Sequence, residues 1–153
     1  MEYNTQDFVS KLEAMGITLT DEQVQQFITY YEMLVEKNKV MNLTGITEFD
    51  EVLEKHFEDS LSLIRVVDLN QNFKIMDLGT GAGFPGMVLK IIFPNLKVTL
   101  VDSLNKRIEF LKMVKEKLKL TNIEIIHSRI EDLARNIVYR EQYDLCVSRA
   151  VAN

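Results

Sequence analysis

The sequence predicts an α/β fold, in which helices wind on both faces of a parallel β-sheet and a helical segment precedes the sheet. From residue 74 onward, short apolar runs alternate four times with helical patterns. A glycine-rich turn joins the first run to its helix, as in doubly wound sheets. Residues 1–70 show only the helical spacing of apolar residues. We therefore expect a helical extension at residues 1–70 and an α/β core at residues 71–153.

The extension is predicted to contain three helices. The first ends near Gly16, because glycine is the common helix C-cap. The second begins at Thr20–Gln23, which has the form of a capping box. It carries one apolar stripe, formed by Val24, Phe27, Ile28, Tyr31, Leu34 and Val35. A loop over residues 38–45 and a third helical pattern over residues 49–64 follow, and the boundary is expected at residues 70–72.

The core is predicted to alternate four strands with three helices. The strands are expected at residues 74–78, 97–102, 123–127 and 143–148, which are apolar runs typical of buried parallel strands. The helices are expected at residues 87–93, 105–120 and 130–136, the first of them stopping at Pro94.

Composition and charge exclude several classes of protein. The 153 residues are 46% hydrophobic and 27% charged, as in globular proteins, and no apolar run approaches the roughly 20 residues that cross a bilayer. The net charge of −5 argues against indiscriminate nucleic-acid binding. Residues 73–153 nevertheless carry thirteen basic against nine acidic residues, which leaves room for a local basic face. The polar N-terminus is not a secretory signal, and one cysteine fits a reducing, cytoplasmic setting.

A glycine-rich segment joins the first strand to the first helix of the core. Glycine there permits positive φ and lets a ligand approach the backbone. Gly79, Gly81 and Gly83 form GxGxG, whereas the dinucleotide fingerprint needs its third glycine where Phe84 stands. A bulky residue leaves less room for a pyrophosphate, and the preceding Asp77 would oppose phosphate but suit a cationic sulfonium. The pattern therefore favours S-adenosylmethionine over NAD.

Asp102 ends the second predicted strand, 23 residues after Gly79. A carboxylate at that point can accept hydrogen bonds from both hydroxyls of a ribose. The alternative is that Asp102 or Ser103 caps the helix that follows. The glycine loop beside it favours the ribose interpretation.

Other polar residues allow two interpretations each. His56 lies on the apolar stripe of the third helix, where a histidine is usually a core residue. Cys146 is expected to be an inert core thiol and His127 a structural residue. One cysteine and two distant histidines do not form a usual metal site, so no metal is expected. The helix at residues 105–120 has six basic and two acidic residues, and it forms either a solvated face or a phosphate-contacting surface.

Several motifs together resemble the glucose-inhibited division protein B family. They are Asn42-Leu43-Thr44, His56-x-x-Asp59-Ser60-Leu61, the segment Asp77–Gly86, Arg129-x-Glu131 and Ser148-Arg149-Ala150-Val151-Ala152. Family members are bacterial S-adenosylmethionine-dependent methyltransferases that modify N7 of a guanine in small-subunit (16S) ribosomal RNA. The resemblance implies a Rossmann-like methyltransferase fold with strand order 3-2-1-4 in this chain. It also implies ribosomal RNA or the 30S particle as partner, and we expect a monomer.

The resemblance further implies site residues. Gly79 and Phe84 resemble cofactor contacts, Ile130 and Glu131 a pair beside the adenine, and Arg149 an arginine near the methionine end and the target base. Gly81 and Asp102 complete the predicted cofactor site on the spacing argument above. The remaining candidates are Arg129 and Arg149 for RNA binding, and His56 and Asp59 for the mouth of the active site.

The predicted chemistry requires no catalytic base. Guanine N7 has a free lone pair and carries no proton, so methyl transfer depends on alignment of the reacting atoms. Related enzymes continue past the fourth strand to complete a seven-stranded sheet, so we expect a C-terminally truncated form with an open edge strand. The alternatives are a non-catalytic fragment that binds S-adenosylmethionine, and an NAD-binding module.

Overall fold

The computed structural model describes residues 5–41, 58–65, 68–69, 72–134 and 142–148. Its sheet has four parallel strands, β1 (Lys74–Leu78), β2 (Lys97–Asp102), β3 (Ile123–His127) and β4 (Leu145–Ser148). The strand order is β3-β2-β1-β4, so the predicted fold class and order are confirmed. The first three strands have the predicted bounds, and β4 begins two residues later than predicted.

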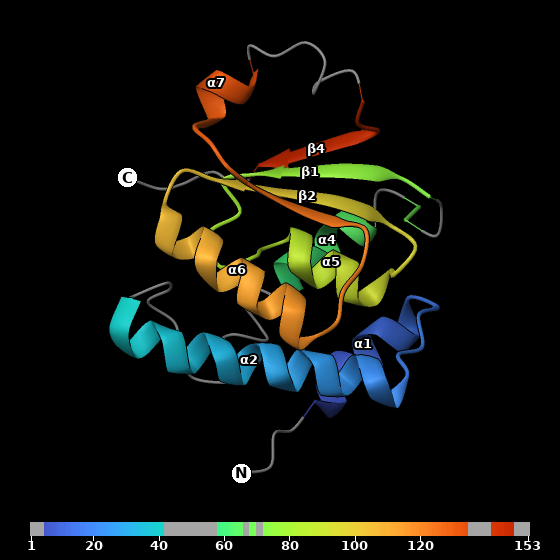
Figure 1. The fold of residues 1–153 in the computed structure, drawn as a ribbon. Helices are drawn as coiled ribbons and strands as arrows, with labels where there is room; N and C mark the ends of the chain where they lie inside the picture. The colour runs from blue at the N-terminus through green and yellow to red at the C-terminus, as the bar shows by residue number, and fades with distance from the viewer. Residues whose placement is uncertain (1–4, 42–57, 66–67, 70–71, 135–141, 149–153) are drawn as a thin grey trace.

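Helices cover the sheet in layers (Figure 1). Helices α5 (Gly86–Ile92) and α6 (Asn105–Lys117) pack on one face, with α4 (Glu58–Ile64) against α5. Helix α2 (Asp21–Met41) packs across α5 and α6 on the side away from the sheet, next to α1 (Gln6–Ala14), and α7 (Ile130–Ala134) follows β3. None of the described helices is both long and apolar enough to span a membrane.

Local signals account for most helix ends. Gly16 has φ 83° and follows the last turn of α1, as predicted. The capping box before α2 is confirmed, because Gln23 N donates to Thr20 Oγ1 at 3.1 Å and Thr20 N donates to Gln23 Oε1 at 2.8 Å. These bonds satisfy amide groups that would otherwise lack partners at the helix start.

Two helix ends were predicted wrongly. Helix α6 stops at Lys117 rather than at residue 120, because Lys119 adopts φ 56° and Leu120 N donates back to Lys115 O at 3.0 Å. This is a Schellman termination with lysine in the usual glycine position. Helix α2 continues to Met41, so the loop predicted from residue 38 begins later. The predicted features at residues 42–57, 70–71 and 135–136 lie outside the described residues.

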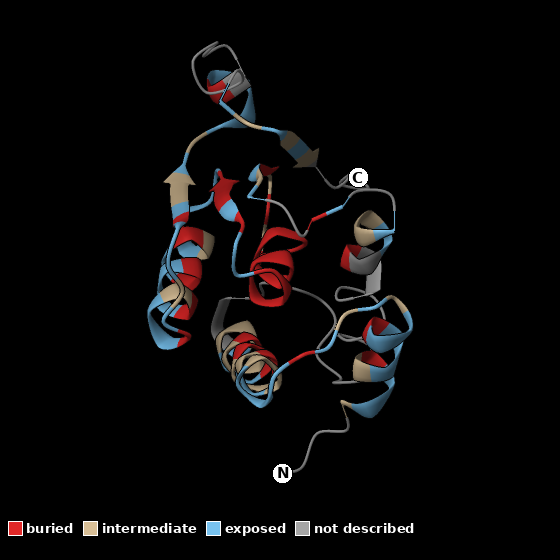
Figure 2. Cartoon of the chain, turned by 90° about the vertical axis from the view of Figure 1, so that its right-hand side faces the viewer, coloured by how far each residue is buried: buried red, intermediate tan, exposed pale blue. Residues whose placement is uncertain are grey.

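One hydrophobic core joins the N-terminal helices to the sheet. It contains Phe8, Phe27 and Leu34 from the extension together with Ile75 and Met87 from the α/β part. Helix α5 is buried along its whole length between the sheet and α2 (Figure 2). The core therefore continues across the boundary predicted near residue 70.

Cys146 was predicted to be a core thiol, and this is wrong because it is exposed. Its strand neighbours Leu145 and Val147 pack against the main core, and alternate residues of a strand point to opposite faces. Cys146 pairs with Met76 in the sheet and lies on the other face.

Candidate functional site

The glycine loop, residues 79–86, connects β1 to α5 at the carboxyl end of the sheet. Gly79, Gly81 and Gly83 have φ values of 70°, 59° and 109°, which L-residues rarely adopt. The amides of Gly79 and Thr80 both donate to the carbonyl of Val101, at 2.9 and 3.0 Å. The need for positive φ is thus confirmed, and the loop is tied to the neighbouring strand.

Two of the glycines are partly exposed, and one of them, Gly81, borders open space. A Cβ built on Gly81 would meet no atom within 4 Å, and one built on Gly79 would meet the tip of Ile130 at 3.3 Å. The Ile130 side chain therefore lies against Gly79, whereas the backbone is open at Gly81. A ligand could approach it there, which a side chain would prevent.

The other two glycines face the protein interior. A Cβ on Gly83 would lie 2.5 Å from the Tyr30 hydroxyl, and a Cβ on Gly86 would lie 2.8 Å from Asp77 Oδ2 with Leu100 closer still. These distances are shorter than real Cβ contacts. Gly83 and Gly86 are therefore required by packing rather than by a ligand.

Asp77 holds the loop from beneath. It is fully buried, and its Oδ2 accepts hydrogen bonds from Thr80 Oγ1 at 2.7 Å and from Gly86 N at 2.8 Å. The sequence suggested that its charge would act directly on a ligand. The structure instead directs the carboxylate to the Thr80 hydroxyl and the Gly86 amide, so Asp77 sets the shape of the loop.

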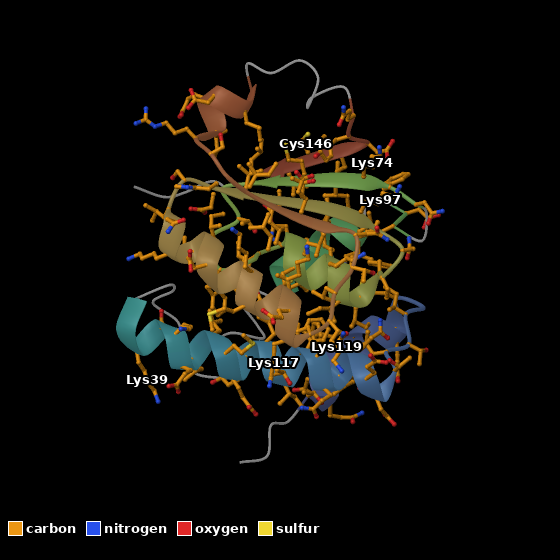
Figure 3. All side chains as sticks on the ribbon, viewed as in Figure 1. Lys39, Lys74, Lys97, Lys117, Lys119 and Cys146 are labelled. Atoms are coloured by element: carbon orange, nitrogen blue, oxygen red, sulfur yellow. The ribbon has the colours of Figure 1, made fainter. Side chains whose placement is uncertain are left out.

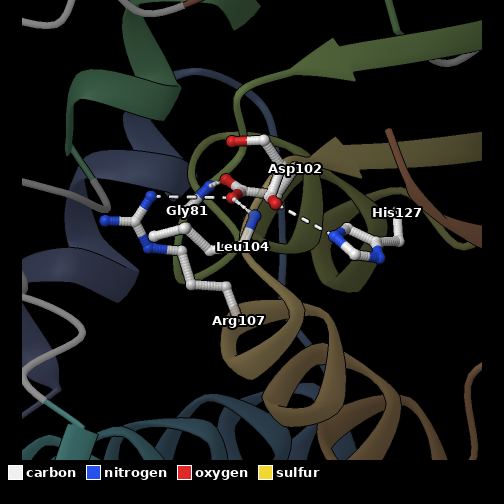
Figure 4. A network of polar contacts seen from close by, with 6 residues as sticks. Gly81, Asp102, Leu104, Arg107 and His127 are labelled. Atoms are coloured by element: carbon white, nitrogen blue, oxygen red, sulfur yellow. Dashed lines mark hydrogen bonds and ion pairs between the residues drawn. The ribbon is translucent and has the colours of Figure 1, made fainter. Parts of the chain in front are cut away.

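Asp102 connects the end of β2 to the same loop (Figure 4). Its Oδ2 accepts a hydrogen bond from Gly81 N at 2.9 Å, and its Oδ1 accepts one from Leu104 N at 3.0 Å. The bond to Leu104, two residues on, is an Asx turn before α6. The alternative that Asp102 or Ser103 is the N-cap residue of α6 is wrong. The N-cap residue is Leu104, which forms no side-chain cap bond. The carboxylate lies beside the accessible Gly81, as ribose binding would require.

Arg107 lies over this carboxylate (Figure 4). Its Nη1 is 3.6 Å from Asp102 Oδ1, and its Nε is buried with no hydrogen-bond partner among the described residues. The Arg107 side chain is 33% exposed whereas that of Asp102 is 3% exposed. A sugar that binds Asp102 must therefore displace the Arg107 guanidinium or bind the carboxylate together with it. On the other side of the turn, His127 Nε2 lies 2.9 Å from Ser103 O, a structural contact as predicted.

Two exposed apolar side chains lie near the site, Leu104 beside the Asp102 carboxylate and Ile130 beside the glycine loop. Leu104 is 41% exposed at the start of α6, and Ile130 is 38% exposed at the start of α7, close to Gly79. Glu131, the next residue, is also exposed. Apolar surface beside a buried acid suits a nucleoside, which combines a flat base with a polar sugar. Nothing in the sequence singled out Leu104, although its place two residues after the acid could have done so.

Phe84 takes a different place from the one expected. It is 3% exposed, and its ring lies 5.7 Å from the ring of Tyr30 in the core. The turn at Gly83 directs the side chain inward, so the expected lining of the pocket by the Phe84 ring is not what the structure places there.

The remaining predicted residues are spread around the site. His56 and Arg149 lie outside the described residues, and Asp59 lies in α4, without a described side chain. Arg129 is exposed just after β3, at the same end of the sheet as the glycine loop. In α6, Lys117 and the following Lys119 lie at the end remote from the loop (Figure 3), which favours the solvated-face interpretation for that half of the helix.

A cavity of about 350 Å³ lies at the opposite end of the sheet from the loop. Lys74 and Lys97, at the amino ends of β1 and β2, are among its lining residues (Figure 3). Doubly wound sheets bind ligands at the carboxyl ends of their strands, so this cavity is not the predicted site. No group of three or more metal-binding side chains occurs in the described part of the chain.

The strand order, the glycine loop after β1 and the acid after β2 define a Rossmann-like fold of the kind that methyltransferases use. The family model described as rRNA small subunit methyltransferase G, GidB, matches residues 23–153. The chain belongs to this family, and the resemblance inferred from its motifs is confirmed.

Relatives of similar sequence are longer than this chain. It is 51% identical over 145 residues to a ribosomal RNA small subunit methyltransferase G of Lachnoclostridium phytofermentans, covering 95% of this chain and 60% of the relative. It is 54% identical over 142 residues to that of Staphylococcus saprophyticus, covering 93% and 59%. The chain thus spans about 60% of the length of these curated relatives. A solved S-adenosylmethionine-dependent methyltransferase from Agrobacterium tumefaciens aligns with 66% of this chain and 31% of its own, at 18% identity and a TM-score of 0.48.

Proposed function

We propose that this chain forms the cofactor-binding part of an S-adenosylmethionine-dependent methyltransferase that modifies N7 of a guanine in small-subunit ribosomal RNA. The observation that carries the proposal is the hydrogen bond between Asp102 and Gly81 at the carboxyl end of the sheet. It places an acid suited to a ribose beside a backbone that a ligand can approach. The names of the family and of the relatives supply the substrate class.

The residues present fit the cofactor. Asp102 would accept hydrogen bonds from the ribose hydroxyls, and Gly79 and Gly81 would border the nucleoside. Leu104 and Ile130 offer apolar surface for the adenine, with Glu131 beside it.

The chemistry requires little from protein acids and bases. The bound cofactor supplies a methyl group on a cationic sulfur, and guanine N7 attacks it with a free lone pair. The transfer would form one N–C bond as one S–C bond breaks, and the positive charge would pass from sulfur to the guanine. The protein's contribution is to align the reacting atoms and exclude competing nucleophiles. We assign Arg149 to positioning near the target base, and Arg129 to RNA phosphates.

The proposal extends to partners and location. Ribosomal RNA, or the 30S particle that contains it, would be the substrate, and the cytoplasm would be the place of action. His56 and Asp59 are proposed to shape the mouth of the active site. We expect the protein to act as a monomer without a bound metal.

A binding and transfer experiment tests the proposal. Calorimetry with S-adenosylhomocysteine and, separately, NADH would be run on this chain and on a chain extended to the length of the relatives. We expect both chains to bind S-adenosylhomocysteine and neither to bind NADH. Methyl transfer to small ribosomal subunits should require the extended chain and place the label on N7. Binding of NADH instead, or label on another guanine atom, would refute the assignment.

A further inference from the structure

We infer that Tyr30, on helix α2 of the N-terminal extension, is a positioning residue that sets the conformation of the glycine loop. The geometric part of this inference stands on the structure alone. Its consequence for cofactor affinity rests on the proposed function.

Tyr30 reaches the loop from 52 residues away in the sequence. Its side chain is completely buried, and its hydroxyl donates a hydrogen bond to the carbonyl of Ala82 at 2.5 Å. Its ring also packs against that of Phe84. The hydroxyl thus contacts the middle of the loop, between Gly81, which borders open space, and Gly83 and Gly86, which face the core.

This hydrogen bond replaces one that a helix would form. Phe84 N donates to Thr80 O at 3.1 Å and Met87 N donates to Gly83 O at 2.8 Å, which is the spacing of helical bonds. The intervening bond would join Gly86 N to Ala82 O. Gly86 N instead donates to Asp77, and Ala82 O accepts from Tyr30.

The two side chains therefore satisfy the amide of Gly86 and the carbonyl of Ala82 at the point where the loop departs from helical bonding, with Gly83 at φ 109°. Asp77 engages the amide from the sheet side, and Tyr30 engages the carbonyl from the side of α2. Without the hydroxyl, a buried carbonyl would lack its partner, which is costly in the protein interior. The loop would then shift to find another donor.

Tyr30 also explains the position of the third glycine. A Cβ on Gly83 would lie 2.5 Å from the Tyr30 oxygen and 2.9 Å from Met87 Cβ, so the Tyr30 hydroxyl is the nearest of the atoms that exclude a side chain there. The GxGxG spacing that distinguishes this loop from a dinucleotide fingerprint is thus coupled to a tyrosine in another helix.

Hydrogen bonds from two glutamines hold α2 against the ends of α5 and α6. Gln23 Nε2 donates to the carbonyls of Ile91 and Ile92 at the end of α5, at 2.9 and 3.1 Å. Gln26 Nε2 donates to Leu118 O at the end of α6, at 3.1 Å. These bonds satisfy terminal carbonyls of both helices and fix α2 against them. Both glutamines lie on α2 ahead of Tyr30 and bind the ends of α5 and α6 away from the loop, and they fix the helix that carries Tyr30.

The test compares Tyr30→Phe with Gln26→Met. Each variant removes one hydrogen bond between α2 and the core and keeps a side chain of similar size, but only Tyr30 contacts the loop. Backbone amide exchange would be measured without ligand, and the affinity for S-adenosylhomocysteine by calorimetry. We expect Tyr30→Phe to accelerate exchange at Gly83 and Phe84 about tenfold and to weaken binding by a similar factor. Gln26→Met should lower Tm and leave both quantities unchanged.

The outcomes separate the two proposals. Unchanged exchange at Gly83 and Phe84 in Tyr30→Phe, or equal acceleration in Gln26→Met, would overturn the role of Tyr30. Failure of the wild-type chain to bind S-adenosylhomocysteine would instead refute the proposed function, and the exchange measurement would still decide the role of Tyr30. Because phenylalanine retains the buried ring, we expect the variant to fold, and its exchange outside the loop checks this.

Discussion

Alanine substitutions at three glycines of the loop should separate backbone strain from steric overlap. Gly81 has positive φ and open space around its Cβ position, so Gly81→Ala introduces strain alone. Gly86 begins helix α5 and has no positive φ, so Gly86→Ala introduces overlap alone, with Leu100 and Asp77. Gly83 combines a φ of 109° with a Cβ position 2.5 Å from the Tyr30 oxygen. Gly83→Ala should therefore be the most destabilising of the three.

The expected magnitudes follow from these geometries. A residue with a side chain in the left-handed region is destabilised by about 1–2 kcal/mol, which is the expected loss for Gly81→Ala. Overpacking a well-filled core costs about 1–3 kcal/mol, which applies to Gly86→Ala. Gly83→Ala incurs both effects, so we expect a loss of about 2–5 kcal/mol in the free energy of unfolding.

Urea denaturation followed by circular dichroism would measure the three losses, and calorimetry with S-adenosylhomocysteine would measure binding. Gly81→Ala should weaken binding more than its loss of stability suggests, because the added methyl group points into the open space beside Asp102. The loss for Gly83→Ala should shrink in a Tyr30→Phe background, which removes the closest contact. Equal stability of the Gly81 and Gly83 variants would refute the reasoning.

Three further predictions concern the acid, a buried lysine and the capping box. Asp102→Asn should weaken binding of S-adenosylhomocysteine about tenfold or more, since an amide cannot accept hydrogen bonds from both sugar hydroxyls and from the loop. Calorimetry would measure the change, and a change under about twofold would contradict ribose binding. Burial lowers the pKa of Lys90 from its ordinary value of 10.5, so the unfolded chain holds that proton more tightly. Stability should accordingly rise as pH increases toward 10.5, and Lys90→Met should flatten this rise in urea titrations at several alkaline pH values. Thr20→Ala removes the hydrogen bond from Gln23 N and should lower the free energy of unfolding by about 1 kcal/mol. Thermal denaturation should show a Tm lower by about 2–4 °C. An unchanged Tm would show that the capping box contributes nothing to stability.

The strands and their order could be predicted because buried parallel strands leave a simple mark in the sequence. Each is a short apolar run between turn residues, and β1, β2 and β3 have the predicted bounds. Helix ends were less predictable where they depend on backbone conformation. Lys119 ends α6 in a left-handed conformation, although lysine is a residue that favours helices. The residue types around Lys119 therefore do not predict its left-handed conformation.

Only the part of the site that is built from residues close together in the sequence could be predicted. The glycine loop and Asp102 were identified because they follow successive strands, and the structure brings them to a hydrogen-bond distance of 2.9 Å. Tyr30 was missed, since it is separated from the loop by 52 residues and lies among other apolar residues of α2. Phe84 was assigned to the pocket on the family resemblance, and the structure places its ring in the core. Which way a side chain turns depends on the φ of the preceding residue, and residue types alone do not specify it.

The boundary expected near residue 70 divides two patterns in the sequence, but the packing does not divide there. Phe27 and Leu34 of the extension share one core with Met87 of α5. Tyr30 lies in the same core and donates to the loop through its hydroxyl. Any displacement of α2 would therefore expose apolar surface and release the loop carbonyl together. The stability of the extension and the conformation of the glycine loop are therefore coupled, and ligand binding at the loop should protect α2 from unfolding as well.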